Sequence, residues 1–319
     1  MTSVGVAPAN AAARRATPRS YLMCPPTYFA VTYEINAWMD ASVPVDRDRA
    51  VAQWEQLVAA YRSAGHRVEL LTPVPGLPDQ VFTANGATMI DGRVLIARFA
   101  HPERAAEAGV HAAWHLAHHD ASLVVIGSRV NEGEGDFAVL SDVVLAGHGF
   151  RTSPAAHREL AALTGRRVVS LELVDPRFYH LDVALAVLDD RAGHIAWYPP
   201  AFTRAARRTV ERLFPDAVVA TTADAYAFGL NAVSDGQHVF LPIGADHLAD
   251  ALTAAGYTVV PIDLGELRKG GGSVKCCTQE LRGPAHRLVS EDHEPHDDRT
   301  SPADGADNIP NPTLTTPEV

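Results

Sequence analysis

The sequence predicts an α/β fold assembled from about five similar units of roughly fifty residues each. Strand and helix signals alternate from residue 21 to residue 289, and the same order of elements recurs along this stretch. The hydrophobic fraction of 47% and the mean hydropathy of −0.04 are those of a chain that can bury a core. A repeat of this kind favours a cyclic or stacked array over a single open sheet.

The first helix is expected over residues 46–64, because Val51, Trp54 and Tyr61 recur on one helical face and Gly65 follows as a stop signal. A strand at 67–71 follows it. The same order then repeats, with a strand at 93–98, a helix at 102–118 and a strand at 123–126. The next unit has a strand at 143–147, a helix that begins at Ser153 with Pro154 in its first turn, and a strand at 167–171.

The second half of the chain continues the pattern. Two strands at 179–188 and 194–198 precede a helix at 203–214 and a strand at 217–221. The last unit has a strand at 238–241, a helix at 246–255 that Gly256 closes, and a strand at 258–262.

The two ends of the chain differ from the middle. Residues 1–20 are expected to form a disordered, Ala-rich leader, and residues 21–289 a single domain. Residues 290–319 contain eight acidic residues, one arginine and five prolines, and they have almost nothing to bury. This tail is expected to be disordered.

Composition excludes several classes of function. The net charge is −11 and no basic patch stands out, so a nucleic acid partner is not expected. No run of eighteen apolar residues occurs, so we expect no membrane span. The three cysteines, Cys24, Cys276 and Cys277, do not form a secreted disulfide framework, which indicates a cytoplasmic protein. Dinucleotide and phosphate-loop glycine motifs are missing from their usual places.

Four short polar stretches lie beside predicted strands, at residues 82–85, 131–136, 180–182 and 270–278. His180 and Asp182 would share a face if they lie on a strand, as a general base beside a cation-binding group or as a surface ion pair. Glu132 and Glu134 stand among glycines and could equally lie in a solvated loop. These two pairs are therefore candidates with a structural alternative.

Cys276 is a candidate nucleophile, or else an inert buried thiol. A metal site is disfavoured, because the adjacent Cys276 and Cys277 cannot easily bind one tetrahedral ion. Gly270, Gly271 and Gly272 form either a flexible turn or a turn that aims a reactive residue at a ligand.

Taken together and in this order, the four stretches resemble the guanidine-modifying enzymes, which include arginine deiminase, dimethylarginine dimethylaminohydrolase and the amidinotransferases. The resemblance covers roughly residues 21–280. It implies a five-bladed α/β propeller (pentein) of repeated ββαβ-type units. It also implies a small-molecule substrate, arginine or a methylated arginine, and chemistry without a metal or organic cofactor.

The family motifs carry over to particular residues. The family nucleophile lies in a Gly-rich stretch that ends C-x-[ST], which Cys276-Cys277-Thr278 matches with Cys276 as the nucleophile. The general acid/base His of H-x-[DK] falls on His180, and Asp182 then matches the carboxylate that grips the guanidinium. The family's E-G-G-D appears one residue longer, from Glu132 through Glu134 to Asp136. Glu132 is favoured as the carboxylate, with Glu134 as the alternative.

The resemblance also implies substrate-binding residues. Arg98 and Arg151 resemble the two family arginines that clamp the substrate α-carboxylate, a task that suits the guanidinium fork. Asn85 stands where deiminases have a second guanidinium-binding Asp. The stretches around Cys24 and Asn85 are similar to a subgroup that includes bacterial arginine dihydrolases.

The function implied is cysteine-dependent hydrolysis of the guanidinium group of arginine to citrulline, and on to ornithine, carbon dioxide and ammonia. Hydrolysis of dimethylarginine is the nearest alternative. An amidinotransferase, which would pass its covalent intermediate to an amine, and a non-catalytic arginine-binding module are further alternatives.

Overall fold

The computed structural model describes residues 14–283, and within them the strands form five three-stranded sheets. In every sheet the first strand pairs antiparallel with the middle strand, which pairs parallel with the third. A helix connects the two parallel strands, as a parallel pair requires a crossover. Each unit is thus ββαβ, as the sequence resemblance implies.

The elements of the first two sheets are β15 (Gln279–Glu280), β1 (Ser20–Met23), α1 (Arg47–Ser63) and β2 (Arg67–Leu70), then β3 (Ala87–Ile90), β4 (Arg93–Ile96), α2 (Glu107–His118) and β5 (Val124–Ile126). The third sheet comprises β6 (Phe137–Val139), β7 (Val144–His148), α3 (Pro154–Thr164) and β8 (Val168–Glu172). The last two comprise β9 (Leu185–Asp189), β10 (His194–Trp197), α4 (Arg204–Leu213) and β11 (Val218–Val219), then α5 (Thr222–Tyr226), β12 (Val233–Ser234), β13 (His238–Pro242), α6 (Asp246–Ala254) and β14 (Thr258–Ile262).

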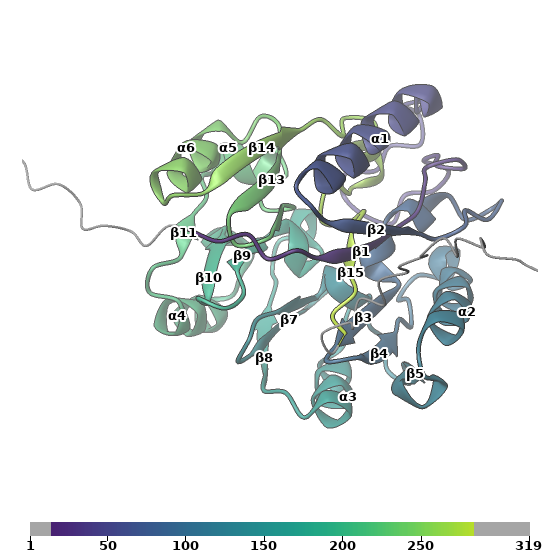
Figure 1. Cartoon of the computed structure of the whole chain (residues 1–319), viewed down its shortest axis with the longest axis horizontal. Helices are drawn as coiled ribbons and strands as arrows, with labels where there is room; N and C mark the ends of the chain where they lie inside the picture. The colour runs from purple at the N-terminus through teal and green to yellow at the C-terminus, as the bar shows by residue number, and fades with distance from the viewer. Residues whose placement is uncertain (1–13, 284–319) are drawn as a thin grey trace, which may run out of the picture. The chain divides into compact units, whose positions relative to one another are not determined.

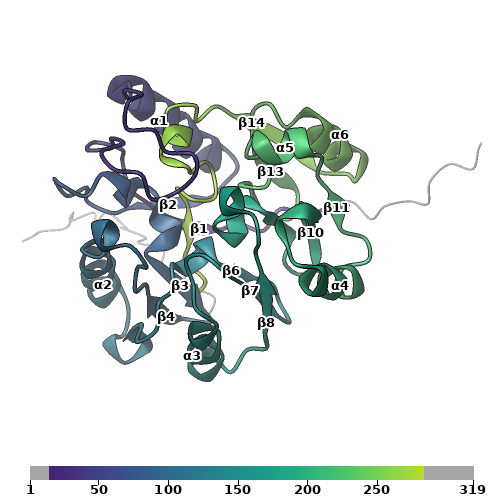
Figure 2. The same cartoon turned by 180° about the vertical axis from the view of Figure 1, so that it is seen from behind.

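The five sheets stand around a common centre, with the helices outside (Figures 1 and 2). The last strand of the chain closes the ring, because β15 pairs with β1 through Tyr21 and Glu280. The first strands of neighbouring sheets contact one another around the centre, as β15 does with β3 and β9 with β12. The fold is a five-bladed α/β propeller.

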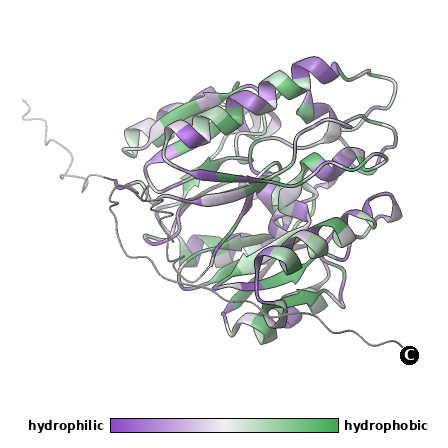
Figure 3. Ribbon diagram, turned by 45° about the vertical axis from the view of Figure 1, so that its right-hand side comes forward, coloured by the Kyte–Doolittle hydropathy of each residue, from purple (hydrophilic) through white to green (hydrophobic). Residues whose placement is uncertain are grey.

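Local sequence explains the helix boundaries. Asp46 caps α1 by accepting a hydrogen bond from the Arg49 N–H, and Pro154 opens α3, which ends at Gly165 with a φ of 70°. In α1, Trp54 and Tyr61 face the core. Figure 3 shows hydrophobic residues along the strands and on one side of the helices, with hydrophilic residues on the outer side.

The structure corrects three details of the predicted elements. The expected strand at 179–188 begins only at Leu185, because two 3₁₀ turns, Pro176–Phe178 and Leu181–Val183, occupy the preceding residues. His180 and Asp182 therefore lie in a turn and do not share a strand face. The expected helix at 102–118 divides into a 3₁₀ turn at Pro102–Arg104 and then α2.

The third correction concerns the expected leader. Arg14 lies over the Tyr257 ring at 3.6 Å, and Arg19 binds Asp190 and Glu280, so residues 14–20 belong to the packed domain. The rest of the leader, residues 1–13, and the tail at 290–319 lie outside the described residues.

Candidate active site

Apart from Arg98 and Arg151, which follow β4 and β7, the predicted site residues lie in turns that precede the first strand of a unit. The 3₁₀ turns Thr83–Asn85, Gly133–Gly135 and Leu181–Val183 lead into β3, β6 and β9, and successive turns contact each other. The turn of residues 273–278 leads into β15 in the same way. Because the units are related by the propeller repeat, these turns meet at one end of the central strands.

Glycines allow the turns to approach closely. Gly133 has a φ of 54°, a left-handed conformation that glycine adopts readily. A Cβ on Gly135 would lie 2.4 Å from Asn85 Nδ2 and 3.2 Å from the His180 ring. The glycines of the stretch from Glu132 to Asp136 therefore bring Asn85 and His180 together.

Cys276 lies against Asp182. The Cys276 thiol donates a hydrogen bond of 3.1 Å to Asp182 Oδ2, and the Asn231 side-chain amide donates one of 3.1 Å to Cys276 Sγ. Cys277 is also buried, but its backbone carbonyl accepts from the Thr83 hydroxyl and its side chain belongs to the hydrophobic core. Of the two adjacent thiols, Cys276 is the one that contacts the carboxylate.

Burial and the neighbouring Asp182 carboxylate raise the pKa of the Cys276 thiol well above its usual value. Burial likewise raises the pKa of Asp182 to about 7, although the hydrogen bond from Cys276 opposes that shift. The sulfur is therefore a thiol at neutral pH, held by a carboxylate. A cationic ligand beside Asp182 would favour the thiolate, because it offsets the carboxylate charge.

His180 and Glu132 form a second buried pair. His180 Nε2 lies 2.8 Å from Glu132 Oε2, and Arg151 Nη1 donates a hydrogen bond of 2.8 Å to the same oxygen. Burial opposes ionisation of Glu132, but Arg151 and His180 hold its pKa well below the usual range. Arg151 also donates to the Ile35 carbonyl, so this guanidinium is anchored on both sides.

Asn85 is fixed by an arginine that the sequence interpretation did not select. Arg104 donates a hydrogen bond of 2.8 Å to Asn85 Oδ1 and two more, of 3.0 and 2.8 Å, to the Glu107 carboxylate. Both Arg104 and Glu107 are buried. With Oδ1 engaged, the Asn85 amide presents its NH₂ group, a donor, on the side of Gly135.

Arg98 does not join this cluster, which corrects the prediction for that residue. Its side chain is exposed, and its backbone pairs with Asn131 in an isolated bridge. Arg98 follows β4 directly, and the pairing with Asn131 directs its side chain to solvent. Arg104, six residues further on, is 3% exposed and stands beside Asn85.

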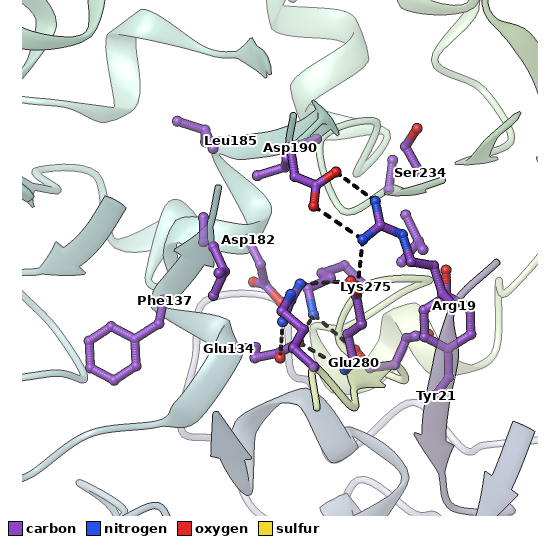
Figure 4. Close-up of a pocket in the computed structure, with 18 residues that line it drawn as sticks. Arg19, Tyr21, Glu134, Phe137, Asp182, Leu185, Asp190, Ser234, Lys275 and Glu280 are labelled. Carbon is purple, nitrogen blue, oxygen red and sulfur yellow. Dashed lines mark hydrogen bonds and ion pairs between the residues drawn. The ribbon is translucent and has the colours of Figure 1, made fainter. Parts of the chain in front are cut away.

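Glu134 faces a different space from Glu132. Its carboxylate accepts from Lys275 and Arg282, in a chain of ion pairs that continues through Glu280 to Arg19 (Figure 4). Together with Asp182 they line a cavity of about 50 Å³.

The Asp136 carboxylate is held by the backbone of the neighbouring turn. Its Oδ1 accepts from the Leu181 N–H at 3.1 Å, and burial raises its pKa to about 6. Of the two glutamates left open by the sequence, Glu132 is the one in contact with His180.

Three buried polar atoms around Cys276 have no hydrogen-bond partner among the described residues: Asn85 Nδ2, Asp182 Oδ1 and His180 Nδ1. A buried donor or acceptor without a partner is costly, so such atoms suit a polar ligand. The arrangement offers a thiol, a carboxylate for a cation and a His–Glu pair for proton transfer.

No group of three or more His, Cys, Asp or Glu side chains is arranged to hold a metal ion in the part of the chain that the structure describes. No helix within residues 14–283 is long and apolar enough to cross a membrane.

Sequence reasoning missed two residues of the cluster, Arg104 and Asn231. Asn231 is followed by Ala232 and β12, much as Asn85 is followed by Gly86 and β3. Comparison of the turns of the five units could have found it. Arg104 carries no comparable signal, because one arginine in a polar turn looks like another.

Comparison with known proteins identifies the family. Residues 25–193 match the family model described as N,N dimethylarginine dimethylhydrolase, eukaryotic. The N(G),N(G)-dimethylarginine dimethylaminohydrolase of Mycobacterium tuberculosis is 54% identical over 275 residues, which cover 84% of this chain and 88% of that protein. The bifunctional arginine dihydrolase/ornithine cyclodeaminase AgrE of Nostoc is 35% identical, and the match covers 84% of this chain but only 38% of that protein.

Solved structures agree as well. The N-terminal domain of ArgZ, a cyanobacterial arginine dihydrolase, bound to its substrate, superposes with a TM-score of 0.80 at 33% identity, over 83% of this chain and 99% of that one. The dimethylarginine dimethylaminohydrolase of Pseudomonas aeruginosa shares the fold, with a TM-score of 0.71 at 18% identity and coverage of 82% and 98%. The chain therefore belongs to the dimethylarginine dimethylaminohydrolase family of the guanidine-modifying enzymes, which hydrolyse guanidino C–N bonds.

Proposed function

We propose that this enzyme hydrolyses the guanidinium group of arginine twice, first to citrulline and then to ornithine, carbon dioxide and a second ammonia. Cys276 is the nucleophile, His180 the acid and base, and Asp182 and Glu132 hold the guanidinium nitrogens. A free small-molecule amino acid is thus the substrate. The location is the reducing cytoplasm, which the three free cysteines support.

The first half of the reaction starts when the substrate cation binds beside Asp182. The cation offsets the Asp182 charge, so the Cys276 proton passes to solvent and the resulting thiolate attacks the central guanidinium carbon. His180 protonates the departing nitrogen, and ammonia leaves a covalent thiouronium on the sulfur. His180 then takes a proton from water, which attacks the same carbon and breaks the C–S bond to give citrulline.

The observation that carries the second half is the Asn85 amide, whose oxygen is engaged by Arg104 and whose NH₂ group has no partner among the described residues. A carboxylate there would favour the cation and disfavour a neutral product. An amide NH₂ can donate to the ureido oxygen of citrulline. Citrulline can therefore stay for a second attack, which gives ornithine and a carbamoyl thioester that water releases as carbon dioxide and ammonia.

Dimethylarginine is the second candidate substrate. The 54% identity to the Mycobacterium tuberculosis relative, together with the family model, supports it. The same Cys276 attack would then release dimethylamine and citrulline. The two candidate substrates differ in the leaving amine, so release of ammonia or of dimethylamine distinguishes them.

Product analysis tests the proposal. The purified protein is incubated separately with arginine, citrulline and asymmetric dimethylarginine, and ornithine, citrulline, ammonia and dimethylamine are measured over time. We expect ornithine and two equivalents of ammonia from arginine. Citrulline as the end product would leave a deiminase, and turnover of dimethylarginine alone would establish the second candidate. Adding glycine tests for amidino transfer, which would form a new guanidino compound.

A further inference from the structure

Asn231 is a buried amide whose four hydrogen bonds all go to the nucleophile turn or to Asp182. Its Oδ1 accepts from the backbone N–H groups of Ser273 at 3.1 Å and Cys276 at 3.2 Å. Its Nδ2 donates to the Asp182 carbonyl at 3.1 Å and to Cys276 Sγ at 3.1 Å. The Asn231 side chain is fully buried, and its backbone carbonyl also accepts from Lys275.

Only a side-chain amide can make this set of bonds, because it carries two donors and an acceptor oxygen with two lone pairs. A carboxylate of the same shape would keep the bonds from Ser273 and Cys276 but could not donate to the sulfur. An alanine would leave two buried N–H groups without their acceptor. Asn231 therefore both shapes the turn and contacts the reacting atom.

The bond to the sulfur matters most when the sulfur is charged, since hydrogen bonds to ions are about twice as strong as neutral ones. Most of the other groups around Cys276 act in the opposite direction, although a backbone hydrogen bond from Ser273 also lowers its pKa. Burial, the Asp182 carboxylate and the neighbouring Cys277 raise its pKa, and the Tyr179 hydroxyl donates away from it, to the Gly271 carbonyl. Among these side chains, Asn231 is the donor that favours the thiolate.

We propose that Asn231 positions Cys276 for attack and stabilises its thiolate through the Nδ2 to Sγ hydrogen bond. This inference rests on the proposed role of Cys276 as the nucleophile. It adds the fifth unit of the propeller to the site, because Asn231 precedes β12. The turns before β15, β3, β6 and β9 supply Cys276, Asn85, Glu132 and Asp182 from the other four units.

The test is Asn231→Asp, which preserves the size and the two accepted bonds. The rate of Cys276 alkylation by iodoacetamide is followed from pH 6 to 11 by peptide mass spectrometry, without substrate, in a Cys277→Ser background. Loss of a hydrogen bond to a charged group should move the alkylation midpoint up by about one to two pH units. In the otherwise unaltered enzyme, kcat for arginine should fall about tenfold to hundredfold while KM changes much less.

Gln80→Glu is the matched control. Gln80 is a buried amide that bonds the backbone of Thr72 and Val74 and does not touch Cys276, so the same chemical change there should leave the alkylation midpoint in place. Asn231→Ser, which keeps a smaller donor, should shift the midpoint by less than Asn231→Asp. An unshifted midpoint in folded Asn231→Asp, judged by circular dichroism, overturns the inference.

The alkylation assay needs no substrate. If arginine is not turned over but the midpoint shifts, only the proposed function fails. If the parent turns over arginine and the midpoint is unshifted, only the role of Asn231 fails.

Discussion

Cys276 and Cys277 are adjacent thiols in different surroundings, and the difference gives the first prediction. Both thiols belong to one buried core cluster, but Cys276 Sγ also forms hydrogen bonds with Asp182 and Asn231. Cys276→Ser should lower ammonia release by more than about a thousandfold, because a hydroxyl is a far weaker nucleophile. Cys277→Ser should keep most of the activity in the folded enzyme. Full activity of Cys276→Ser would show that Cys276 is not the nucleophile.

Arg104 and Arg98 form a natural pair for the second prediction. Replacement by lysine keeps the charge but removes the guanidinium fork that Arg104 uses to bind both Glu107 and Asn85. Arg104→Lys should lower kcat/KM for arginine at least about tenfold, as expected for the loss of a buried charge-assisted bond. Arg98→Lys should stay within about twofold, because the side chain is exposed. If both variants lost kcat/KM equally, burial of Arg104 would not explain a special role for its side chain.

Asn85 carries the third prediction. In Asn85→Asp a second carboxylate stands beside Arg104 near the substrate, and it should favour the arginine cation over neutral citrulline. The parent should convert arginine to ornithine, and the variant should stop at citrulline. Chromatography of both amino acids over the full time course measures this. Ornithine formation by the variant at the parental rate would exclude a role for Asn85 in the second step.

At the residue scale, motifs could nominate candidates where the residues of one short stretch match a family pattern. Cys276, His180 and Asp182 were recognisable from their neighbours in the sequence, and in the structure Cys276 contacts Asp182 while His180 contacts Glu132. Asn231 and Arg104 act through contacts with residues 45 and 19 positions away. No local motif indicates such contacts. Asn231 could have been found only by comparing the turns of the five units, and Arg104 has no comparable signal in the sequence.

Among the secondary-structure elements, the long helices were predictable and the short inner strands were not. Asp46 and Gly165 mark helix ends through capping chemistry that the sequence displays. The inner strands β12 and β15 have two residues each, too few for a periodicity of two to register. The repeat could still be recognised, because the helix and the two strands that it connects recur in each unit.

Helix α2 buries two histidines, His111 and His115, and this makes stability depend on pH. Burial, and then the Arg104 charge, lowers the pKa of His111 from 6.5 to about 4, and burial lowers that of His115 to about 3. The unfolded chain therefore binds more protons than the folded one below pH 6.5. Their contribution is fully present above pH 6.5 and is lost as the pH falls through the folded pKa values.

The fourth prediction follows from that sign. His111→Gln cannot take up a proton, so the free energy of unfolding of this variant should fall less than that of the parent between pH 7.5 and pH 5. One pKa unit corresponds to about 1.4 kcal/mol, so a difference of about 1–2 kcal/mol is expected. Urea titrations at the two pH values measure it. His247→Gln is the control, because that side chain is 74% exposed. If the free energy of unfolding of His111→Gln depended on pH as strongly as that of the parent, the buried His111 would not be the source of this pH dependence.

In the molecule as a whole, ring closure depends on chain segments that are far apart in sequence. β15 pairs with β1, and Arg19, just before β1, binds Glu280 on β15 and Asp190 after β9. Figure 4 shows this arginine between the two carboxylates. The sequence assigned residues up to 20 to a leader because this stretch is Ala-rich and carries arginines without an apolar run of its own. Its partners lie 171 and 261 positions away, so only the closed ring reveals its place.

Arg19 gives the last prediction, at the scale of the whole propeller. Its side chain is only 12% exposed, so removing it leaves the partly buried Asp190 without this cation, and leaves Glu280 with Arg282 as its one remaining ion-pair partner among the described residues. Arg19→Ala should lower the free energy of unfolding by about 2–4 kcal/mol, as expected for breaking one side of a buried ion pair. Urea denaturation measures the loss.

Arg49→Ala is the matched control, because Arg49 is 59% exposed and lies 3.7 Å from Asp263, and such a surface pair contributes less than about 1 kcal/mol. Since Arg19 joins the first and fourth blades through the strand that closes the ring, the Arg19→Ala variant should also expose the peptides of β15 and β1 to faster hydrogen exchange than the control does. Equal stability of the two variants would mean that strand pairing alone closes the propeller.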